Sequence, residues 1–131
     1  MADRRKALVI DDEPLVCRSV KKILAIEEID TDIATSGREG LVMARNSKYD
    51  MLLVDVKMPE MNGYEASKSI RKIEKERNDL EKTIIIAMTA HVSQKYIDKC
   101  FENNMDDYIT KPLKRKDLFS ILLKWAKPSA A

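Results

Sequence analysis

Short runs of consecutive apolar residues alternate along this chain with longer stretches in which apolar residues recur every three or four positions. Continuous apolar runs are typical of strands buried on both faces, and the longer period is typical of helices that bury one face. The runs predict strands at 7–10, 31–34, 51–54, 83–88 and 107–110, with a helix after each.

Local signals mark where these helices begin. Pro14 suits the first turn of a helix, where its missing N–H costs nothing. Two pairs match the capping box, Ser36 with Glu39 and Asn62 with Glu65. We expect the helices to bury apolar side chains at helical spacing: Val16, Val20, Ile23 and Leu24 in the first, Ala66, Ile70 and Ile73 in the third, Tyr96, Ile97, Cys100 and Phe101 in the fourth, and Leu118, Ile121, Leu122 and Trp125 in the last.

Alternating strands and helices favour right-handed crossovers and a parallel sheet that is covered on both faces. We therefore predict an α/β fold in which residues 1–131 form one domain around a single doubly wound, five-stranded parallel sheet. The order 2-1-3-4-5, common among flavodoxin-like folds, fits five such units and places the end of the first strand beside that of the third. The polar stretch 74–82 is interpreted as a solvated helix end and loop.

Composition narrows the classes of function. Lys and Arg number 24 against 22 Asp and Glu, and no basic stripe is interleaved with aromatic residues, which argues against direct nucleic-acid binding. No apolar run approaches the ~20 residues of a membrane span or follows the N-terminus as in a signal peptide. We therefore expect a cytoplasmic protein in which Cys17 and Cys100 stay reduced.

The predicted sheet brings together three carboxylates, those of Asp11, Asp12 and Asp55. Such groups repel one another, and a divalent cation would relieve that repulsion. Oxygen ligands without nearby His or Cys suit Mg²⁺ or Mn²⁺, and an Asp can itself accept a phosphoryl group. The hydroxyl of Thr89 and the ammonium of Lys111, at two other strand ends, could bind phosphate.

Each of these residues has an ordinary interpretation when it is taken alone. Asp12 could equally be the N-cap before Pro14, and Asp55 an acid in a loop. Thr89 could bond the backbone at a strand end, and Lys111 could be solvated surface. Their joint occurrence at the ends of different strands favours the functional interpretation.

Asp11-Asp12, Asp55 with Pro59 and Gly63 after it, Thr89-Ala90 and Lys111-Pro112 together resemble the receiver domain of two-component response regulators. The resemblance covers nearly the whole chain. It implies that Asp55 is the phosphoacceptor, that Asp12 binds Mg²⁺ directly, and that Asp11 acts mainly through water.

The same resemblance implies further roles. The backbone carbonyl of Lys57 would be the third protein ligand of the metal. Thr89 and Lys111 would hold phosphoryl oxygens, and the peptide bond before Pro112 would be cis.

The resemblance also implies a switch and its partners. Thr89 would move toward the new phosphate and Tyr108 would follow inward, which would reshape a face made by the fourth helix, fifth strand and fifth helix. A histidine kinase or histidine phosphotransfer domain would donate the phosphoryl group, and a downstream effector would bind that face. Lys57 and His91 would flank the route of attacking water, so we predict that Lys57 alters the phosphoryl lifetime. For His91, an ordinary place on a surface loop is the alternative.

Four other functions compete with a stand-alone switch. The chain could be a receiver domain from a hybrid sensor histidine kinase. An Asp-nucleophile phosphohydrolase would carry a second acid two residues after the nucleophile, where this chain has Lys57. A flavin or nucleotide carrier would have a phosphate-binding loop after the first strand, where Asp11-Asp12-Glu13 would repel phosphate. A phosphorylation-independent interaction module would not require an intact acceptor site.

Overall fold

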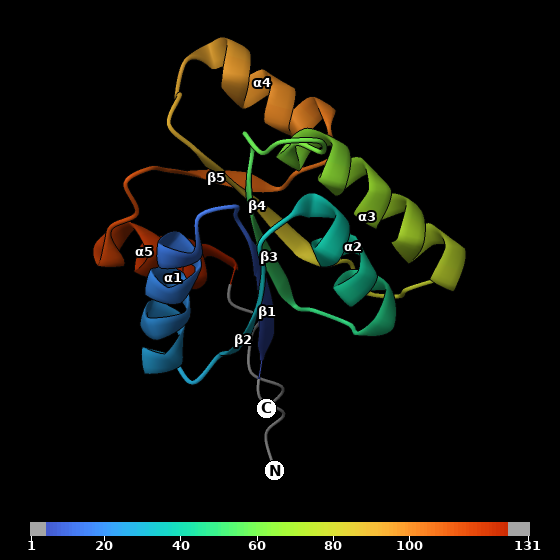
Figure 1. The fold of residues 1–131 in the computed structure, drawn as a ribbon, viewed down its shortest axis with the longest axis horizontal. Helices are drawn as coiled ribbons and strands as arrows, with labels where there is room; N and C mark the ends of the chain where they lie inside the picture. The colour runs from blue at the N-terminus through green and yellow to red at the C-terminus, as the bar shows by residue number, and fades with distance from the viewer. Residues whose placement is uncertain (1–4, 126–131) are drawn as a thin grey trace.

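Residues 5–125 are described by the computed structural model, and they form one parallel sheet flanked by helices (Figure 1). Its strand order is β2-β1-β3-β4-β5, as predicted. The elements in chain order are β1 (Lys6–Ile10), α1 (Pro14–Ile26), β2 (Asp30–Ala34), α2 (Gly37–Asn46), β3 (Met51–Asp55), α3 (Gly63–Arg77), β4 (Ile84–Thr89), α4 (Gln94–Glu102), β5 (Asp107–Thr110) and α5 (Arg115–Trp125). The predicted domain ran from 1 to 131, and its two ends lie outside the described residues.

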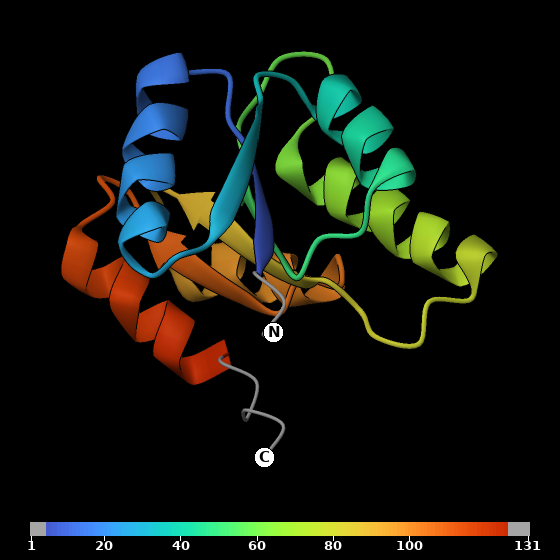
Figure 2. The ribbon, with the colours of Figure 1, turned by 90° about the horizontal axis from the view of Figure 1, so that it is seen from below.

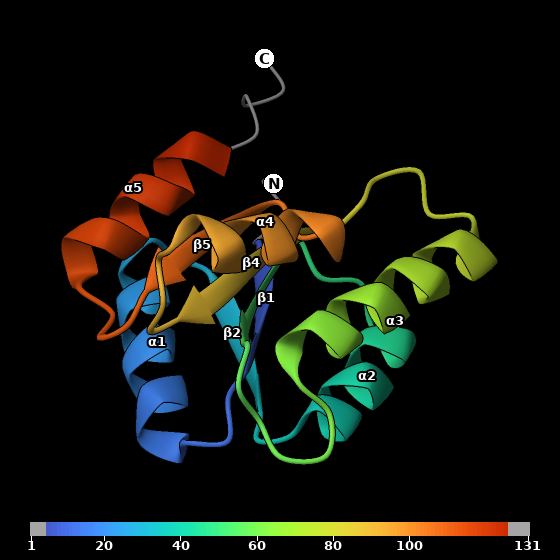
Figure 3. The same ribbon diagram turned by 90° about the horizontal axis from the view of Figure 1, so that it is seen from above.

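Helices cover both faces of the sheet (Figures 2 and 3): α1 and α5 lie on one side, and α2 and α3 lie on the other. Alternate strand residues therefore enter two different cores. Leu8 and Leu52 belong to the core under α2, α3 and α4, whereas Val9 and Leu53 belong to the core under α1 and α5. The continuous apolar runs thus correspond to strands that are buried on both faces, as the sequence indicated.

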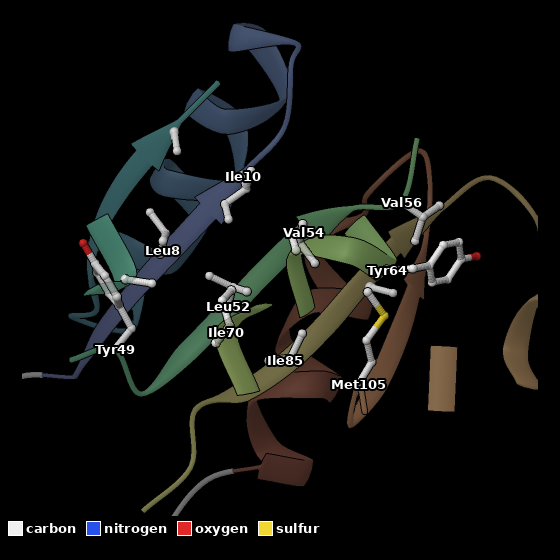
Figure 4. Packing of buried hydrophobic residues seen from close by; sticks show 14 of the residues in the cluster. Leu8, Ile10, Tyr49, Leu52, Val54, Val56, Tyr64, Ile70, Ile85 and Met105 are labelled. Carbon is white, nitrogen blue, oxygen red and sulfur yellow. The ribbon is translucent and has the colours of Figure 1, made fainter. Parts of the chain in front are cut away.

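The register between neighbouring strands aligns the apolar runs. Val54 pairs with Ile10 on β1 and with Ala87 on β4. Figure 4 shows Leu8, Ile10, Leu52 and Val54 projecting from neighbouring strands into the same core. Because the runs end together, the polar residues that follow them emerge along one edge of the sheet.

Most of the predicted helix signals are confirmed. The Asn62 and Glu65 side chains form a reciprocal capping box, and the Ser36 hydroxyl accepts a hydrogen bond from the Glu39 N–H. Pro14 is the first residue of α1, whose N-cap is Glu13, so the alternative role of Asp12 as that N-cap is wrong. Both cysteines are free and buried.

Two expectations about burial need correction. Phe101 is 49% exposed, because α4 turns it away from the core that Cys100 enters. Glu74 was expected to be solvated but is only 4% exposed. Its carboxylate accepts hydrogen bonds from Arg71 at 2.8 Å and from the Thr83 N–H at 2.6 Å, and these bonds compensate for the loss of water.

Within residues 5–125, none of the helices combines the length and the hydropathy that crossing a lipid bilayer would require.

Candidate functional site

The predicted site residues converge at the carboxyl edge of the sheet. Asp11 and Asp12 directly follow β1, and Asp55 is the last residue of β3. Asp11, Asp12 and Asp55 each offer a carboxylate oxygen, and these oxygens all lie within 4.8 Å of one another. The structure thus brings together the acidic cluster that the sequence predicted.

Asp11 is fully buried and its carboxylate is fixed on both sides. Its Oδ1 accepts a hydrogen bond from the Glu13 N–H at 2.9 Å, and its Oδ2 accepts one from Lys111 Nζ at 2.8 Å. Its backbone carbonyl accepts a bond from Cys17 Sγ at 3.3 Å. With both carboxylate oxygens engaged, Asp11 is oriented mainly to hold Lys111, while Asp12 beside it is exposed.

Asp55 is 5% exposed, and its Oδ1 lies 3.3 Å from both the Lys57 backbone nitrogen and Lys111 Nζ. Burial and the neighbouring Asp11 carboxylate raise its pKa to about 6, although Lys111 opposes the shift. Most Asp55 side chains are therefore ionised near neutral pH. The site then carries negative charge that Lys111 does not balance, which favours a bound cation.

Lys111 reaches both buried acids from the end of β5. Its backbone N–H donates to the Thr89 carbonyl at 2.8 Å, and its peptide bond to Pro112 is cis, as predicted. Burial by itself lowers the pKa of the Lys111 ammonium, but its hydrogen bond to Asp11 and the charges of Asp11 and Asp55 outweigh burial and raise that pKa above its usual range. Lys111 is therefore a fixed cation beside Asp55.

Thr89 ends β4, and its hydroxyl is bonded locally. Thr89 Oγ1 accepts a hydrogen bond from the His91 N–H at 3.0 Å and donates one to the His91 carbonyl at 3.1 Å. A movement of this hydroxyl toward a ligand on Asp55 would have to break both bonds.

Lys57 and His91, which by the family resemblance would flank the route of attacking water, are in direct contact. Lys57 Nζ lies 3.2 Å from His91 Nε2, which links the loop after β3 to the loop after β4. His91 lies in the loop after β4, is half-buried, and its ring stacks on Tyr96 with centroids 4.8 Å apart.

Tyr108 lies in the middle of β5 and is half-buried against the core under α4. Its backbone N–H donates to Asp107 Oδ1 at 2.8 Å. The other oxygen of Asp107 accepts a bond from the Trp125 indole at 2.9 Å and pairs with Lys124 at 2.9 Å. The backbone of Tyr108 is thereby tied to the end of α5.

Sequence reasoning did not find the residues that support the site from behind. The hydrogen bond from the Cys17 thiol to the Asp11 carbonyl depends on the way helix α1 turns back over β1, and no local sequence pattern indicates this hydrogen bond. The sequence also did not indicate that the aromatic side chains of Tyr64 and Tyr96 lie beside Lys57, because each fits the pattern of an apolar helix face.

Comparison with known proteins agrees with this geometry. Residues 7–123 match the model of the response regulator receiver domain. The hybrid signal transduction histidine kinase L of Dictyostelium discoideum is 36% identical over 125 residues, which cover 93% of this chain and 7% of that kinase. The chain thus spans a small part of the length of this relative.

Two solved structures illustrate the similarity. The receiver domain of a Pseudomonas aeruginosa sensor histidine kinase, with a magnesium ion coordinated in its active-site cleft, is 29% identical with a TM-score of 0.80, covering 94% of this chain and 98% of that one. A Saccharomyces cerevisiae receiver domain in complex with a histidine phosphotransfer protein has a TM-score of 0.87 at 24% identity, covering 95% and 90%, and shows the shared fold.

The matched family model covers the five strands except for Lys6, together with the acidic edge and Lys111. This chain therefore belongs to the response regulator receiver domain family, the phosphorelay modules of two-component signalling.

Proposed function

We propose that Asp55 is the phosphoacceptor of this receiver domain and that residues 1–131 act as one signalling switch. The observation that supports this most directly is the position of Asp55, a buried carboxylate 3.3 Å from a fixed ammonium group and within 4.8 Å of two other acids.

In the proposed reaction an ionised Asp55 oxygen attacks the phosphorus of a phosphohistidine. The new bond is P–O, the broken bond is P–N, and the departing imidazole takes up a proton from solvent. Lys111, already beside Asp55, compensates the charge of the transferred group, and the Thr89 hydroxyl binds one of its oxygens after leaving His91.

The acidic cluster fits a divalent cation, Mg²⁺ or Mn²⁺. Three carboxylate oxygens within 4.8 Å form an oxygen-only donor set. Burial and, after it, the charge of Asp11 raise the pKa of Asp55, and a cation would neutralise that charge. Asp12 and Asp55 would hold the ion directly with the carbonyl of Lys57, and Asp11, whose oxygens are engaged, would act through water. When bound, the ion would supply charge neutralisation for phosphoryl transfer.

The signal would leave through α4, β5 and α5. Thr89 occupies the end of β4 opposite Thr110, and Tyr108 is two residues further back on β5. Movement of the Thr89 hydroxyl toward a phosphoryl group would open space near Tyr108 and shift the face that an effector binds. A histidine kinase or histidine phosphotransfer domain is the proposed donor.

The relatives of this chain also leave room for a larger parent protein. Because the matching part of the Dictyostelium kinase is only 7% of its length, we propose as the second possibility that this receiver is one module of a hybrid histidine kinase. In both cases the chemistry at Asp55 would be that of a phosphoacceptor and not of a hydrolase acting on external substrates.

The test uses acetyl phosphate as a small phosphodonor with Mg²⁺, followed by intact mass measurement. We expect one phosphate adduct on the wild type and on Asp98→Ala, which removes an acid on α4 outside the cluster. We expect none on Asp55→Ala, and none on the wild type when EDTA removes the metal. An adduct on Asp55→Ala equal to that on the wild type would remove Asp55 from the proposed role.

A further inference from the structure

A groove lies directly beside the acceptor site, between the loop after β3 and helix α4. Its volume is about 480 Å³, within the range of small-ligand and side-chain binding sites. In Figures 1 and 3, α4 lies next to the first turn of α3, which forms the other wall. The lining residues are Val56, Lys57, Met58, Pro59, Asn62, Tyr64, His91, Tyr96 and Lys99.

The charged side chains of the groove are all basic. Lys57 and Lys99 line it together with His91, and none of the acids among residues 5–125 does. Of the acids next to lining residues in the sequence, Glu65 accepts the Asn62 N–H at 3.1 Å in the capping box and Asp98 accepts the Gln94 amide at 2.7 Å, whereas Glu60 is exposed. Among the described residues, neither Lys57 nor Lys99 forms an ion pair with any acid. Both cations are therefore available to an anionic group.

The rest of the lining is aromatic and apolar. His91 and Tyr96 are stacked, and Lys99 Nζ lies 4.7 Å from the centre of the Tyr64 ring. A long cation held over an aromatic face presents its charge at the rim, while the rings form the floor. Such a surface fits a ligand that carries an apolar side chain next to a negative charge.

Tyr64 adds an independent observation. It is 8% exposed, and its hydroxyl is buried beside the Cys100 thiol of α4, without a hydrogen bond of good geometry among the described residues. Figure 4 shows this hydroxyl directed away from Val54 and the sheet. Because a thiol is only a weak hydrogen-bond partner, an acceptor on a bound ligand would satisfy this hydroxyl better.

From these features we propose that the groove binds an acidic peptide segment of a partner protein, in which an aromatic or large aliphatic side chain adjoins a carboxylate. The apolar side chain would pack on Tyr96 and Pro59, and the carboxylate would pair with Lys99 and Lys57. An open groove with positive charge at its rim suits an extended peptide segment, and this positive charge is complementary to the negative charge of an acidic segment.

This site would communicate with the acceptor through Lys57. The Lys57 ammonium contacts His91, and the Lys57 backbone nitrogen lies 3.3 Å from Asp55 Oδ1. A peptide carboxylate that takes this ammonium would break its contact with His91. The coupling rests on the proposed function of Asp55, whereas binding of the peptide does not.

The test is a titration of the ¹⁵N-labelled, unphosphorylated protein with N-acetyl-Glu-Phe-Glu-amide, followed by NMR. N-acetyl-Lys-Phe-Lys-amide is the peptide control. We expect the acidic peptide to shift the amide signals of Lys57, His91, Tyr96 and Lys99, and to bind at least tenfold more weakly when NaCl rises from about 50 to about 500 mM. The basic peptide should leave these signals unchanged.

Matched variants distinguish specific binding in the groove from non-specific electrostatic attraction to the protein. Lys99→Gln should weaken the binding about threefold to fivefold, the effect of losing one exposed ion pair. Lys72→Gln removes the same charge from an exposed position on α3 outside the groove and should leave the affinity unchanged. Tyr64→Phe should also weaken binding, since it deletes the hydroxyl and keeps the ring.

Several outcomes would overturn the proposal. These are equal binding of the acidic and basic peptides, equal effects of Lys99→Gln and Lys72→Gln, or shifts confined to residues outside the groove. Concentration-dependent shifts of the same signals without any peptide would assign the groove to a second copy of this chain instead. We expect Asp55→Asn to bind the peptide as the wild type does. Peptide binding would therefore still be observed if Asp55 proved not to be the phosphoacceptor.

Discussion

Lys57 Nζ lies 3.2 Å from His91 Nε2, so that two loops from neighbouring strands meet across the face of the acceptor site. The Lys57 ammonium is exposed, and the Lys57 backbone nitrogen lies 3.3 Å from Asp55 Oδ1. We predict that water attacking an aspartyl-phosphate on Asp55 passes this pair.

We expect Lys57→Asn to shorten the aspartyl-phosphate lifetime about threefold or more, which corresponds to a barrier about 0.7 kcal/mol lower. The shorter Asn side chain cannot reach His91 and would leave a wider path for water. The measurement is the loss of the phosphate adduct over time, with Lys72→Asn as a control on the exposed face of α3. Equal half-lives for the wild type and Lys57→Asn would contradict the assigned role.

The raised pKa of Asp55 predicts a stability effect with a definite sign. In the metal-free folded protein this pKa is about 6, whereas an unfolded chain has an Asp pKa of about 3.9. The folded state therefore binds the proton more tightly, and ionised Asp55 lowers the stability at pH values above about 6. This penalty should disappear as the pH falls toward about 4.

Asp55→Asn removes the ionisable group, so we expect the metal-free variant to be about 1 to 2 kcal/mol more stable than the wild type near pH 7. The gain should shrink toward zero near pH 4. Urea denaturation in EDTA at both pH values measures it. Added Mg²⁺ should then stabilise the wild type and not the variant. If Asp55→Asn were less stable than the wild type near pH 7, ionised Asp55 would not destabilise the metal-free fold.

Sequence patterns were sufficient for the fold and for the acidic edge because both depend on local signals. Apolar runs ending at Asp11 and Asp55 define where strands stop, and a parallel sheet places those ends together. The Glu74 burial and the Lys57–His91 contact depend on side chains that meet across different loops. No periodicity encodes such contacts, and the polar composition of 74–82 favoured the wrong, solvated interpretation.

The bonds of Thr89 make a prediction about the switch. Its hydroxyl is held by both backbone groups of His91 and has to leave them to bind a phosphoryl oxygen. We expect Thr89→Ala to accept phosphate on Asp55 but to lose most of the phosphorylation-induced change in the Tyr108 amide signal. NMR with acetyl phosphate and Mg²⁺ gives both readings.

Thr110→Ala is the control for Thr89→Ala, because Thr110 pairs with Thr89 in the sheet but is exposed. It should respond to phosphorylation as the wild type does. If the Tyr108 signal moves as far in Thr89→Ala as in the wild type, the two residues are not coupled.

Arg71 connects α3 to the amino edge of the sheet, far from the acceptor. Its guanidinium donates to the Thr83 and Asn104 carbonyls at 2.8 and 3.0 Å, and pairs with Glu74 and Asp106 at 2.8 and 2.7 Å. Arg71→Ala would leave the buried Glu74 carboxylate without its cation. We expect it to destabilise the protein by about 2 to 4 kcal/mol in urea denaturation.

Two variants control the Arg71 prediction. Lys72→Ala, on the exposed face of the same helix, should change the stability by less than about 0.5 kcal/mol. Arg71→Lys keeps the charge but not the planar fork, so it should recover only part of the loss. If Arg71→Lys recovered all of the stability lost in Arg71→Ala, charge alone, and not the set of directed hydrogen bonds, would account for the stabilisation by Arg71.

Gly63, the first residue of α3, lies against the backbone at the end of β3. A Cβ at this position would lie 2.5 Å from the Asp55 carbonyl oxygen and 2.9 Å from Val56 Cα, and neither atom can move without shifting the acceptor loop. We expect Gly63→Ala to destabilise the protein by about 1 to 3 kcal/mol and to slow phosphorylation of Asp55.

Gly37, the first residue of α2, provides the matched control for Gly63. The three atoms nearest to an added Cβ there all belong to the Met61 side chain, at 3.0 to 3.1 Å, and this flexible side chain can shift by a few tenths of an ångström more readily than backbone can. Gly37→Ala should therefore fold and accept phosphate nearly as the wild type does. Comparable losses in the two variants, measured by urea denaturation and by the rate of adduct formation, would show that the close approach at Gly63 does not position the acceptor.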